Sequence, residues 1–381
     1  MQYVFVDDSV SYDGYSPIRR PLGGAEKAVV SLATALLDRG ADVTVVNNTT
    51  YAHMAFGVNY VPIGGVGIPR TADVVIAVRK PLLLGSVRGA KQRVLWVTGS
   101  TDYLSAAANA PLWDSFQPTF MFTNPLQQRA YTGKVPSVLL TPGTSAAFLP
   151  PILSESTQPA VPQSFYPHTD GPPPELETPV VPPEPAAPTF PPAHAIVTTH
   201  PLHGLGWLLD VWTTQIQPQL PDARLLVISA VLNKGIKGES VPDDIVPILE
   251  KVIAAASANV VVAEPRGDEG MATNYREARV HLYPGNPLDY ACWTLRESQS
   301  LGVPAVARAL GGVNACIDNG QTGYVVPDEA AFANVTLEIL RNDAVYQNLS
   351  KAASDVGRER TWDVVAEEFE AIVLKLPGIA R

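Results

Sequence analysis

Apolar residues in the first 150 positions alternate between two periodicities. Residues 3–6 form a continuous apolar run, which is typical of a parallel strand buried on both faces. Over residues 29–37, apolar side chains recur every three or four positions, along one face of a helix that Gly40 ends. A second apolar run follows at residues 43–46. A strand, a helix and a strand in this order predict a right-handed parallel unit.

The same alternation continues along most of the chain. Further elements are expected as strands at 74–78, 94–97, 119–122, 137–140, 195–198, 225–228, 259–262, 280–283 and 305–306, and as helices at 204–216 and 294–301. We therefore predict an α/β protein with two facing Rossmann-like domains, at residues 1–150 and 194–360. Residues 361–381 are expected to add a helix that packs back toward the first domain. Ligands of such open sheets bind outside the carboxyl ends of the strands, so the cleft between the domains is the expected site.

A proline-rich segment at residues 151–193 separates the two domains. Fourteen of the 42 residues from 151 to 192 are proline, which lacks an amide donor and disfavours helix and sheet interiors. The segment therefore reads as a linker or surface insert with polyproline character. Docking of a protein partner on this insert is an alternative role.

Length and charge limit the classes of function. A chain of 381 residues can form two hydrophobic cores. Residues 1–150 carry 12 Lys and Arg against 9 Asp and Glu, a balance of +3, and the remaining residues carry 15 against 28, a balance of −13. An acidic chain without a basic stripe argues against a nucleic-acid partner. The positive balance of the first half fits an anionic acceptor, a peripheral contact with a membrane surface, or ordinary surface variation.

The cysteines, the histidines and the first residues of the chain exclude several classes of site and segment. Cys292 and Cys316 make neither a disulfide framework nor a zinc site, and six scattered histidines add no metal signature. The opening MQYVFVDD does not resemble a secretory signal, and no run of 18 apolar residues occurs. We expect a cytoplasmic protein without a metal ion.

Two glycine-containing helix starts are candidate anion sites. Gly23 and Gly24 precede the first long helix, where free amides and the helix dipole favour a negative group. His203 and Gly204 stand in the same way before the helix expected at 204–216. A tight turn and a plain helix start are the simpler interpretations of the two pairs.

A pair of acids eight positions apart carries the clearest chemistry. Asp289 and Glu297 lie on either side of a short loop and a helix start, after the strand at 280–283. A carboxylate can accept both hydroxyls of a vicinal diol, so two of them could hold a ribose and a hexose of one ligand. A solvated acid and a helix-capping acid are the alternative interpretation.

Taken together, these segments resemble family 4 of the retaining glycosyltransferases. The segment GGAEKAVVSLATALLDRGADVTVV is similar to the N-terminal signature of that family, and LLTPGTSAAFLP to its strand end before the crossover. DYACWTLRESQSLGVPAVARALGG is similar to its E-x7-E block, with Asp289 as the first acid. HGLGWLLDVW and PDARLLV resemble a subgroup of it. The resemblance implies the GT-B architecture, a UDP- or GDP-sugar as substrate rather than a cofactor, and no metal ion.

The resemblance also implies roles for individual residues. Glu297 would bind the ribose hydroxyls, and Asp289 would bind the donor sugar. His203 is the second expected catalytic residue and would lie near Asp289. Backbone amides from Cys292 through Trp293 to Thr294 would approach the sugar and the phosphates, with Gly204 at the same end of the site. Gly23 and Gly24 would lie across the cleft, near the diphosphate and the acceptor. Backbone groups from Val262 to Glu264 would hold the base.

Several positions depart from the family pattern. Asp289 is one methylene shorter than the usual glutamate, and Ala315 stands where a glutamate is common. The Arg and Lys that usually face the diphosphate are absent from the segment around His203. A retaining glycosyltransferase that acts on a hydroxyl of a glycan, lipid or other acceptor is the function we predict. The alternatives are a non-catalytic partner subunit and a different enzyme on the same fold, such as an epimerase or a phosphorylase-like enzyme.

Overall fold

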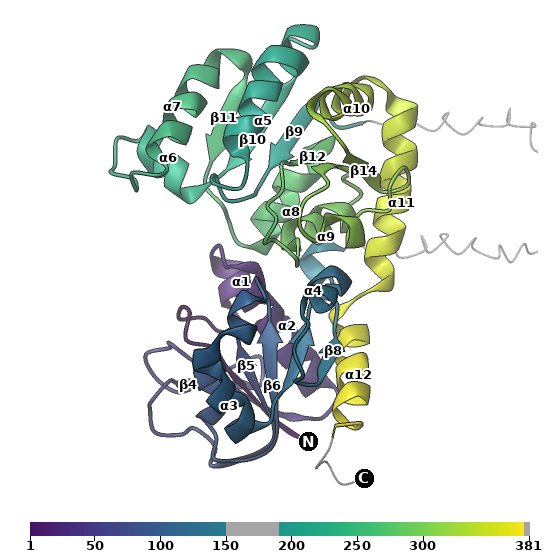
Figure 1. The fold of residues 1–381 in the computed structure, drawn as a ribbon. Helices are drawn as coiled ribbons and strands as arrows, with labels where there is room; N and C mark the ends of the chain where they lie inside the picture. The colour runs from purple at the N-terminus through teal and green to yellow at the C-terminus, as the bar shows by residue number, and fades with distance from the viewer. Residues whose placement is uncertain (150–189, 377–381) are drawn as a thin grey trace, which may run out of the picture.

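The computed structural model describes residues 1–149 and 190–376, which form two α/β lobes. The N-terminal lobe, purple to blue in Figure 1, lies below the C-terminal lobe, which runs from teal to yellow. Each lobe contains a mainly parallel sheet with helices packed on it. The prediction of two Rossmann-like domains is therefore confirmed.

The N-terminal sheet has eight strands in the order β3-β4-β2-β1-β5-β6-β7-β8. The strands are β1 (Gln2–Val6), β2 (Asp42–Asn47), β3 (His53–Ala55), β4 (Val58–Pro62), β5 (Thr71–Val78), β6 (Gly89–Val97), β7 (Thr119–Phe122) and β8 (Ser137–Leu139). All pairs are parallel except β3 with β4, two strands that were not predicted. The first predicted run, residues 3–6, is fully buried in the centre.

The C-terminal sheet has six parallel strands in the order β11-β10-β9-β12-β13-β14. The strands are β9 (His194–Val197), β10 (Arg224–Ile228), β11 (Val260–Ala263), β12 (Val280–Tyr283), β13 (Ala305–Arg308) and β14 (Gly323–Val326). The strand order reverses between β9 and β12, which lie side by side. A crevice at such a reversal is where ligands of doubly wound sheets bind.

Twelve α-helices are present among the described residues. They are α1 (Ser16–Arg19), α2 (Gly24–Asp38), α3 (Ala110–Phe116), α4 (Pro125–Ala130), α5 (Leu205–Val211), α6 (Ala230–Ile236), α7 (Val246–Ala254), α8 (Asp268–Arg276), α9 (Trp293–Ser300), α10 (Glu329–Arg341), α11 (Asp343–Glu359) and α12 (Trp362–Val373). None of the helices in the described part of the chain is both long and apolar enough to cross a membrane.

The helix predicted over residues 204–216 is regular only as far as Val211. From Trp212 to Ile216 it widens into a π-turn. Two consecutive threonines explain the change: the Thr213 hydroxyl donates to the Leu209 carbonyl at 2.8 Å, and the Thr214 hydroxyl donates to the Asp210 carbonyl at 2.7 Å. Side chains that bond to the carbonyls of the preceding turn compete with the helical ladder.

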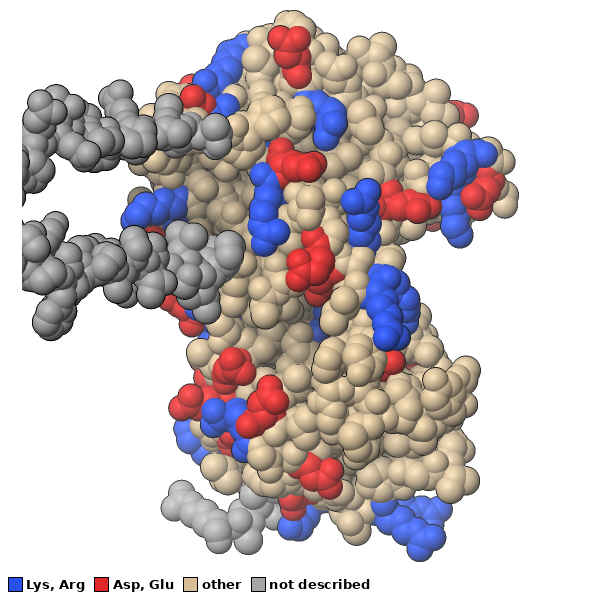
Figure 2. All heavy atoms as spheres, turned by 180° about the vertical axis from the view of Figure 1, so that it is seen from behind, with Lys and Arg blue, Asp and Glu red and all other residues tan. Residues whose placement is uncertain are grey.

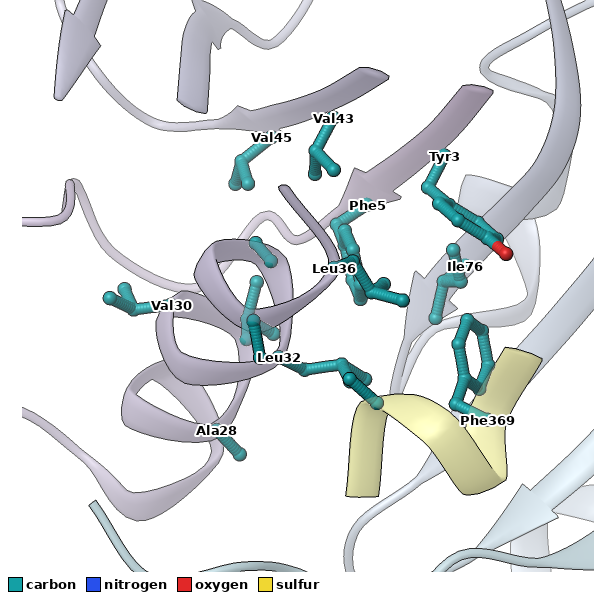
Figure 3. Packing of buried hydrophobic residues seen from close by; sticks show 14 of the residues in the cluster. Tyr3, Phe5, Ala28, Val30, Leu32, Leu36, Val43, Val45, Ile76 and Phe369 are labelled. Carbon is teal, nitrogen blue, oxygen red and sulfur yellow. The ribbon is translucent and has the colours of Figure 1, made fainter. Parts of the chain in front are cut away.

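Helices α2 and α12 pack on the N-terminal sheet. The apolar face of α2 lies on strands β1 and β2, as Figure 3 shows for Leu32 and Leu36. Helix α12, yellow in Figure 3, adds Phe369, whose ring lies 5.6 Å from that of Tyr3. The Arg39 guanidinium contacts Glu370 at 2.6 Å. The last helix therefore completes the core of the domain in which the chain begins.

Among the described residues, two chain segments cross between the lobes, and they lie side by side. Thr144, shortly before the first passage, forms a parallel bridge with Thr361, directly after the return. The Thr144 amide donates to the Arg360 carbonyl at 2.8 Å, and the Arg360 guanidinium donates to the Thr141 carbonyl at 2.8 Å. Of the proline-rich segment predicted at 151–193, residues 151–189 lie outside the described residues.

Figure 2 shows the rear face of both lobes. Lys and Arg alternate there with Asp and Glu, and the visible face carries no continuous basic stripe.

Candidate functional site

A cavity of about 550 Å³ lies between the lobes, beyond the carboxyl ends of β9 and β12. Its lining comes from both lobes and consists of Leu22, Gly23, Gly24 and Lys27 on the N-terminal side and Thr198, Thr199, His200, His203, Tyr283, Asn286, Leu288, Asp289, Trp293, Thr294 and Glu297 on the C-terminal side. A second pocket of about 430 Å³ continues toward the ends of β10 and β11. It shares several lining residues with the first, among them Leu22, Lys27 and Glu297. Together they form an elongated site that could take a two-part ligand.

Glu297 lies on α9 where the two pockets meet. Its side chain is 13% exposed, and burial raises the pKa of its carboxyl group. The Tyr275 hydroxyl donates to Oε2 at 3.4 Å, and the Lys27 ammonium donates to Oε1 at 2.6 Å. Sequence reasoning placed Glu297 in the cleft, and the structure brings it there together with Asp289.

Asp289 is held by hydrogen bonds to both of its carboxylate oxygens. The Tyr283 hydroxyl donates to Oδ2, and the Cys292 amide donates to Oδ1 at 3.1 Å. Burial raises the pKa of Tyr283 well above its usual value, so this hydroxyl remains a donor. The Cys292 amide, which was expected to approach the sugar or the phosphates, is thus occupied by Asp289.

The start of α9 forms part of the cavity wall. Cys292 precedes the helix in the left-handed region, with φ of 47°, and this turn directs Trp293 and Thr294 into the lining. The first amides of a helix have no acceptor within it. Of the three backbone amides predicted to approach the ligand, those of Trp293 and Thr294 can therefore still donate to it.

The glycine pair at the start of α2 faces this turn. A Cβ on Gly24 would lie 2.1 Å from Cγ of Trp293, in the other lobe. A Cβ on Gly23 would meet only the end of the flexible Glu26 side chain, 2.2 Å away. Gly24 is therefore required by the approach of the two lobes, in addition to any contact with a ligand.

His203 lines the cavity, and Gly204 lies behind it. Burial, followed by repulsion from His200, lowers the pKa of His203, so its imidazole is neutral at pH 7. Gly204 has φ of +86° before α5 and does not belong to the lining. His203 can thus donate one hydrogen bond but does not replace a cation.

The residues predicted to hold the base are displaced from the site. Val262 packs against the core of the C-terminal lobe, and the exposed Glu264 forms an ion pair with Lys237 at 3.1 Å. Neither lines the second pocket, whose wall in this region consists of Pro265 and Arg266. Strand β11 extends to Ala263, so the chain turns toward the cleft only afterwards, one or two residues beyond the predicted positions. The assignment of Val262 to Glu264 to the base stays a prediction.

Two charged residues that meet at the cleft were not predicted. The Nζ atom of Lys27 lies 2.8 Å from Oδ1 of Asp268, in addition to its contact with Glu297. Asp268 begins α8 and is 5% exposed. Lys27 stands one helical turn after Gly23, which could have indicated its position, whereas nothing in the sequence singles out Asp268.

Buried polar groups support the C-terminal wall of the cavity. The imidazole of His281 lies between the Thr198 hydroxyl, 3.1 Å from Nε2, and the Ser298 hydroxyl, 2.8 Å from Nδ1. Burial lowers the pKa of His281 from 6.5 to about 3. This neutral histidine ties the end of β9 to α9, which carries Glu297.

A further ionic group lies at the carboxyl edge of the N-terminal sheet. The Arg79 guanidinium contacts Asp7 at 2.9 Å and Glu26 at 2.6 Å. Arg79 follows β5 with φ of +67°, an uncommon conformation for a residue other than glycine. In the described ranges 1–149 and 190–376, no group of three or more His, Cys, Asp or Glu side chains is placed to hold a metal ion.

Comparison with known proteins points to glycosyltransferases. The model of the family described as Glycosyl transferases group 1 matches residues 195–342, which include both acids. A phosphatidyl-myo-inositol mannosyltransferase of Mycobacterium leprae is 31% identical over 104 residues, which cover 27% of this chain and 28% of that protein. The chain spans between 28% and 38% of the length of the first curated relatives that it matches.

Solved structures match over nearly the whole chain. A sucrose-phosphate synthase from Thermosynechococcus elongatus has a TM-score of 0.68 at 14% identity, covering 97% of this chain and 98% of that chain. The chain has the GT-B fold. Another protein of this fold, HepE from Anabaena in complex with UDP and glucose, has a TM-score of 0.64 at 13% identity and covers 99% of this chain and 100% of its own. The match to the Glycosyl transferases group 1 family model lies within the C-terminal lobe of this GT-B chain.

Proposed function

We propose that this GT-B protein is a retaining glycosyltransferase that moves a sugar from a nucleotide-sugar to a hydroxyl group of an acceptor. The observation that carries the proposal is the meeting of Asp289 and Glu297 in one interlobe cavity, opposite Gly23 and Gly24. Two carboxylates in a partly buried cleft suit a ligand with two polyhydroxylated parts. The HepE complex, on the same fold, contains UDP and glucose.

The cavity suggests a position for each part of the donor. Glu297, shared by the two pockets, would accept hydrogen bonds from the ribose, with the base in the pocket beside Pro265 and Arg266. Asp289 would accept from the donor sugar, with His203 as a neutral donor nearby. The first amides of α9 would face the diphosphate.

The reaction breaks the bond between C1 of the sugar and the phosphate oxygen. The electron pair of that bond remains on the diphosphate, while the acceptor oxygen bonds to C1. We assign no side chain as the general base: the proton of the acceptor passes to the departing phosphate oxygen. The products are a glycoside with retained configuration and a nucleoside diphosphate, and the main demand on the protein is stabilisation of the negative charge that develops.

A donor panel tests the proposal. UDP-, GDP- and ADP-sugars would be titrated calorimetrically and then assayed for free nucleoside diphosphate with candidate acceptors. Binding of one donor together with release of its diphosphate is the expected result. The absence of binding for every donor would contradict the proposal.

One observation favours a second candidate, a subunit that binds the nucleotide without turnover. The lining of the main cavity from the C-terminal lobe contains no Lys or Arg among the described residues. Binding of a donor without release of diphosphate, with all acceptors, would select this candidate.

Unchanged turnover after treatment with EDTA is expected for the enzyme, because the family that the sequence resembles needs no metal ion.

A further inference from the structure

Lys27 reaches across the cleft from the N-terminal lobe. It extends from α2 and ends between two carboxylates of the C-terminal lobe, 2.6 Å from Oε1 of Glu297 and 2.8 Å from Oδ1 of Asp268. The side chains of Lys27, Glu297 and Asp268 are 12%, 13% and 8% exposed, so salt screens the cluster weakly. The ring of Phe148 lies 5.0 Å from the ammonium nitrogen and adds a cation–π contact.

The charges of this cluster do not balance. Two carboxylates and one ammonium leave one negative charge in a buried place. Burial raises the pKa of Glu297 and of Asp268, and Lys27 partly opposes both increases. A nucleoside diphosphate would bring further negative charge into the same cavity, so the cleft needs a cation that can face it.

Lys27 is the one Lys or Arg among the described residues that line the main cavity. Arg266 belongs only to the second pocket, near the ends of β10 and β11. His203 is neutral at pH 7, because burial lowers its pKa. The charge that the C-terminal lobe lacks is therefore present on the opposite wall of the cleft.

The position of Lys27 on α2 allows its ammonium group to move toward the phosphates. The Lys27 amide donates to the Gly23 carbonyl at 3.0 Å, so the residue stands one turn after the glycine pair in the same wall. A ribose that binds Glu297 competes with Lys27 for that carboxylate. The four-carbon stem of a lysine is flexible, so the ammonium can change partners without a shift of the helix.

We propose that Lys27 is the cation of the leaving diphosphate and that the ribose of the donor takes its place on Glu297. This inference rests on the proposed function. As the C1–O bond breaks, its electron pair stays on the phosphate oxygen, and the ammonium stabilises that charge without giving up a proton. Because the cation and the two acids come from opposite lobes, the charge arrangement for transfer exists only when the cleft is closed.

The test distinguishes the contribution of the ribose to the binding affinity from that of the phosphates. Calorimetric titrations with uridine and UDP, and with guanosine and GDP, compare the wild type with Lys27→Met, Lys27→Arg and Asp268→Asn. Lys91→Met is the matched control, since Lys91 is an exposed N-terminal-lobe lysine paired with Asp73 at 2.7 Å. Thermal melts check that each variant folds.

In Lys27→Met the affinity for the diphosphate should fall about 10- to 100-fold, as for a lost charged hydrogen bond. The affinity for the nucleoside should be unchanged or higher, because its competitor for Glu297 is gone. Lys27→Arg should retain most of the preference for the diphosphate, and Asp268→Asn should not reduce it. The control should match the wild type.

Equal loss of affinity for nucleoside and diphosphate in Lys27→Met would overturn the inference, since it would mark a purely structural contact. Unchanged affinity for both would overturn it as well. If the wild type binds and turns over a donor in either case, the proposed function stands without this role for Lys27. If the wild type binds none of the UDP-, GDP- and ADP-sugars of the donor panel, the proposed function fails, and the inference fails with it.

Discussion

The two walls of the cleft rest on different supports. On the N-terminal wall, Gly24 and Lys27 belong to a helix whose inner face packs mainly on an apolar core, with one buried acid, Glu26, paired to Arg79. On the C-terminal wall, Glu297 and Asp289 stand on buried polar groups, among them His281 and Tyr283. An apolar support tolerates changes in pH, whereas buried titratable groups tie the shape of a site to their protonation state.

The largest expected effect concerns the polar support of the C-terminal wall. His281 has a folded pKa of about 3 against an ordinary value of 6.5. Because the unfolded chain binds the proton more readily, this group contributes stability above pH 6.5 that is lost as the pH falls toward 3. The loss should approach roughly 4 kcal/mol of unfolding free energy. Urea unfolding at a series of pH values measures this loss, and hydrogen exchange of the β12 amides shows whether it falls on this strand. His281→Gln should flatten the pH dependence of the unfolding free energy. Parallel curves for the two proteins would contradict the assignment.

The next effect concerns the acid at the junction of the two pockets. Glu297→Gln should weaken nucleotide binding by about 1.5–3 kcal/mol, because a charged acceptor for the ribose is lost. Titration with the nucleotide that the wild type binds provides the measurement. Glu269→Gln is the control, since Glu269 is exposed on α8 and lies outside both pockets of the cleft. Equal affinity of Glu297→Gln and the wild type would refute the role of Glu297.

A third change breaks the fit between the walls. In Gly24→Ala the added methyl group would lie 2.1 Å from Cγ of Trp293, so one lobe must shift. Overpacking of this kind costs about 1–3 kcal/mol. We expect a lower melting temperature and weaker donor binding. Gly99→Ala, at a site where a Cβ has no neighbour within 4 Å, should change neither property. Wild-type behaviour of Gly24→Ala would indicate that the lobes do not close on each other in solution.

The smallest effect is expected outside the cleft. Glu264→Gln should change nucleotide affinity by less than about twofold, since the exposed Glu264 pairs with Lys237 and lies outside the pocket lining. The titration used for Glu297→Gln serves here too. A large loss of affinity would restore the original expectation that Glu264 helps to hold the base.

The sequence was informative where a signal is local. The helix of residues 24–38 followed from its apolar period, and the two acids followed from a motif that spans only nine positions. Lys27 and Glu297 are 270 positions apart, and no local pattern reports that their side chains meet. The same holds for Asp268, whose role comes from the approach of the lobes. The residues predicted to hold the base lie just before those that line the second pocket, because the end of a strand is uncertain by one or two residues from sequence.

The paired passages between the lobes have a mechanical consequence. Thr144 and Thr361 are bridged, so two chain segments leave the N-terminal lobe side by side. Because backbone hydrogen bonds join the two segments, any movement of one lobe against the other bends both segments at the same place. Such a movement changes the distance between Lys27 and Glu297, which lie in different lobes.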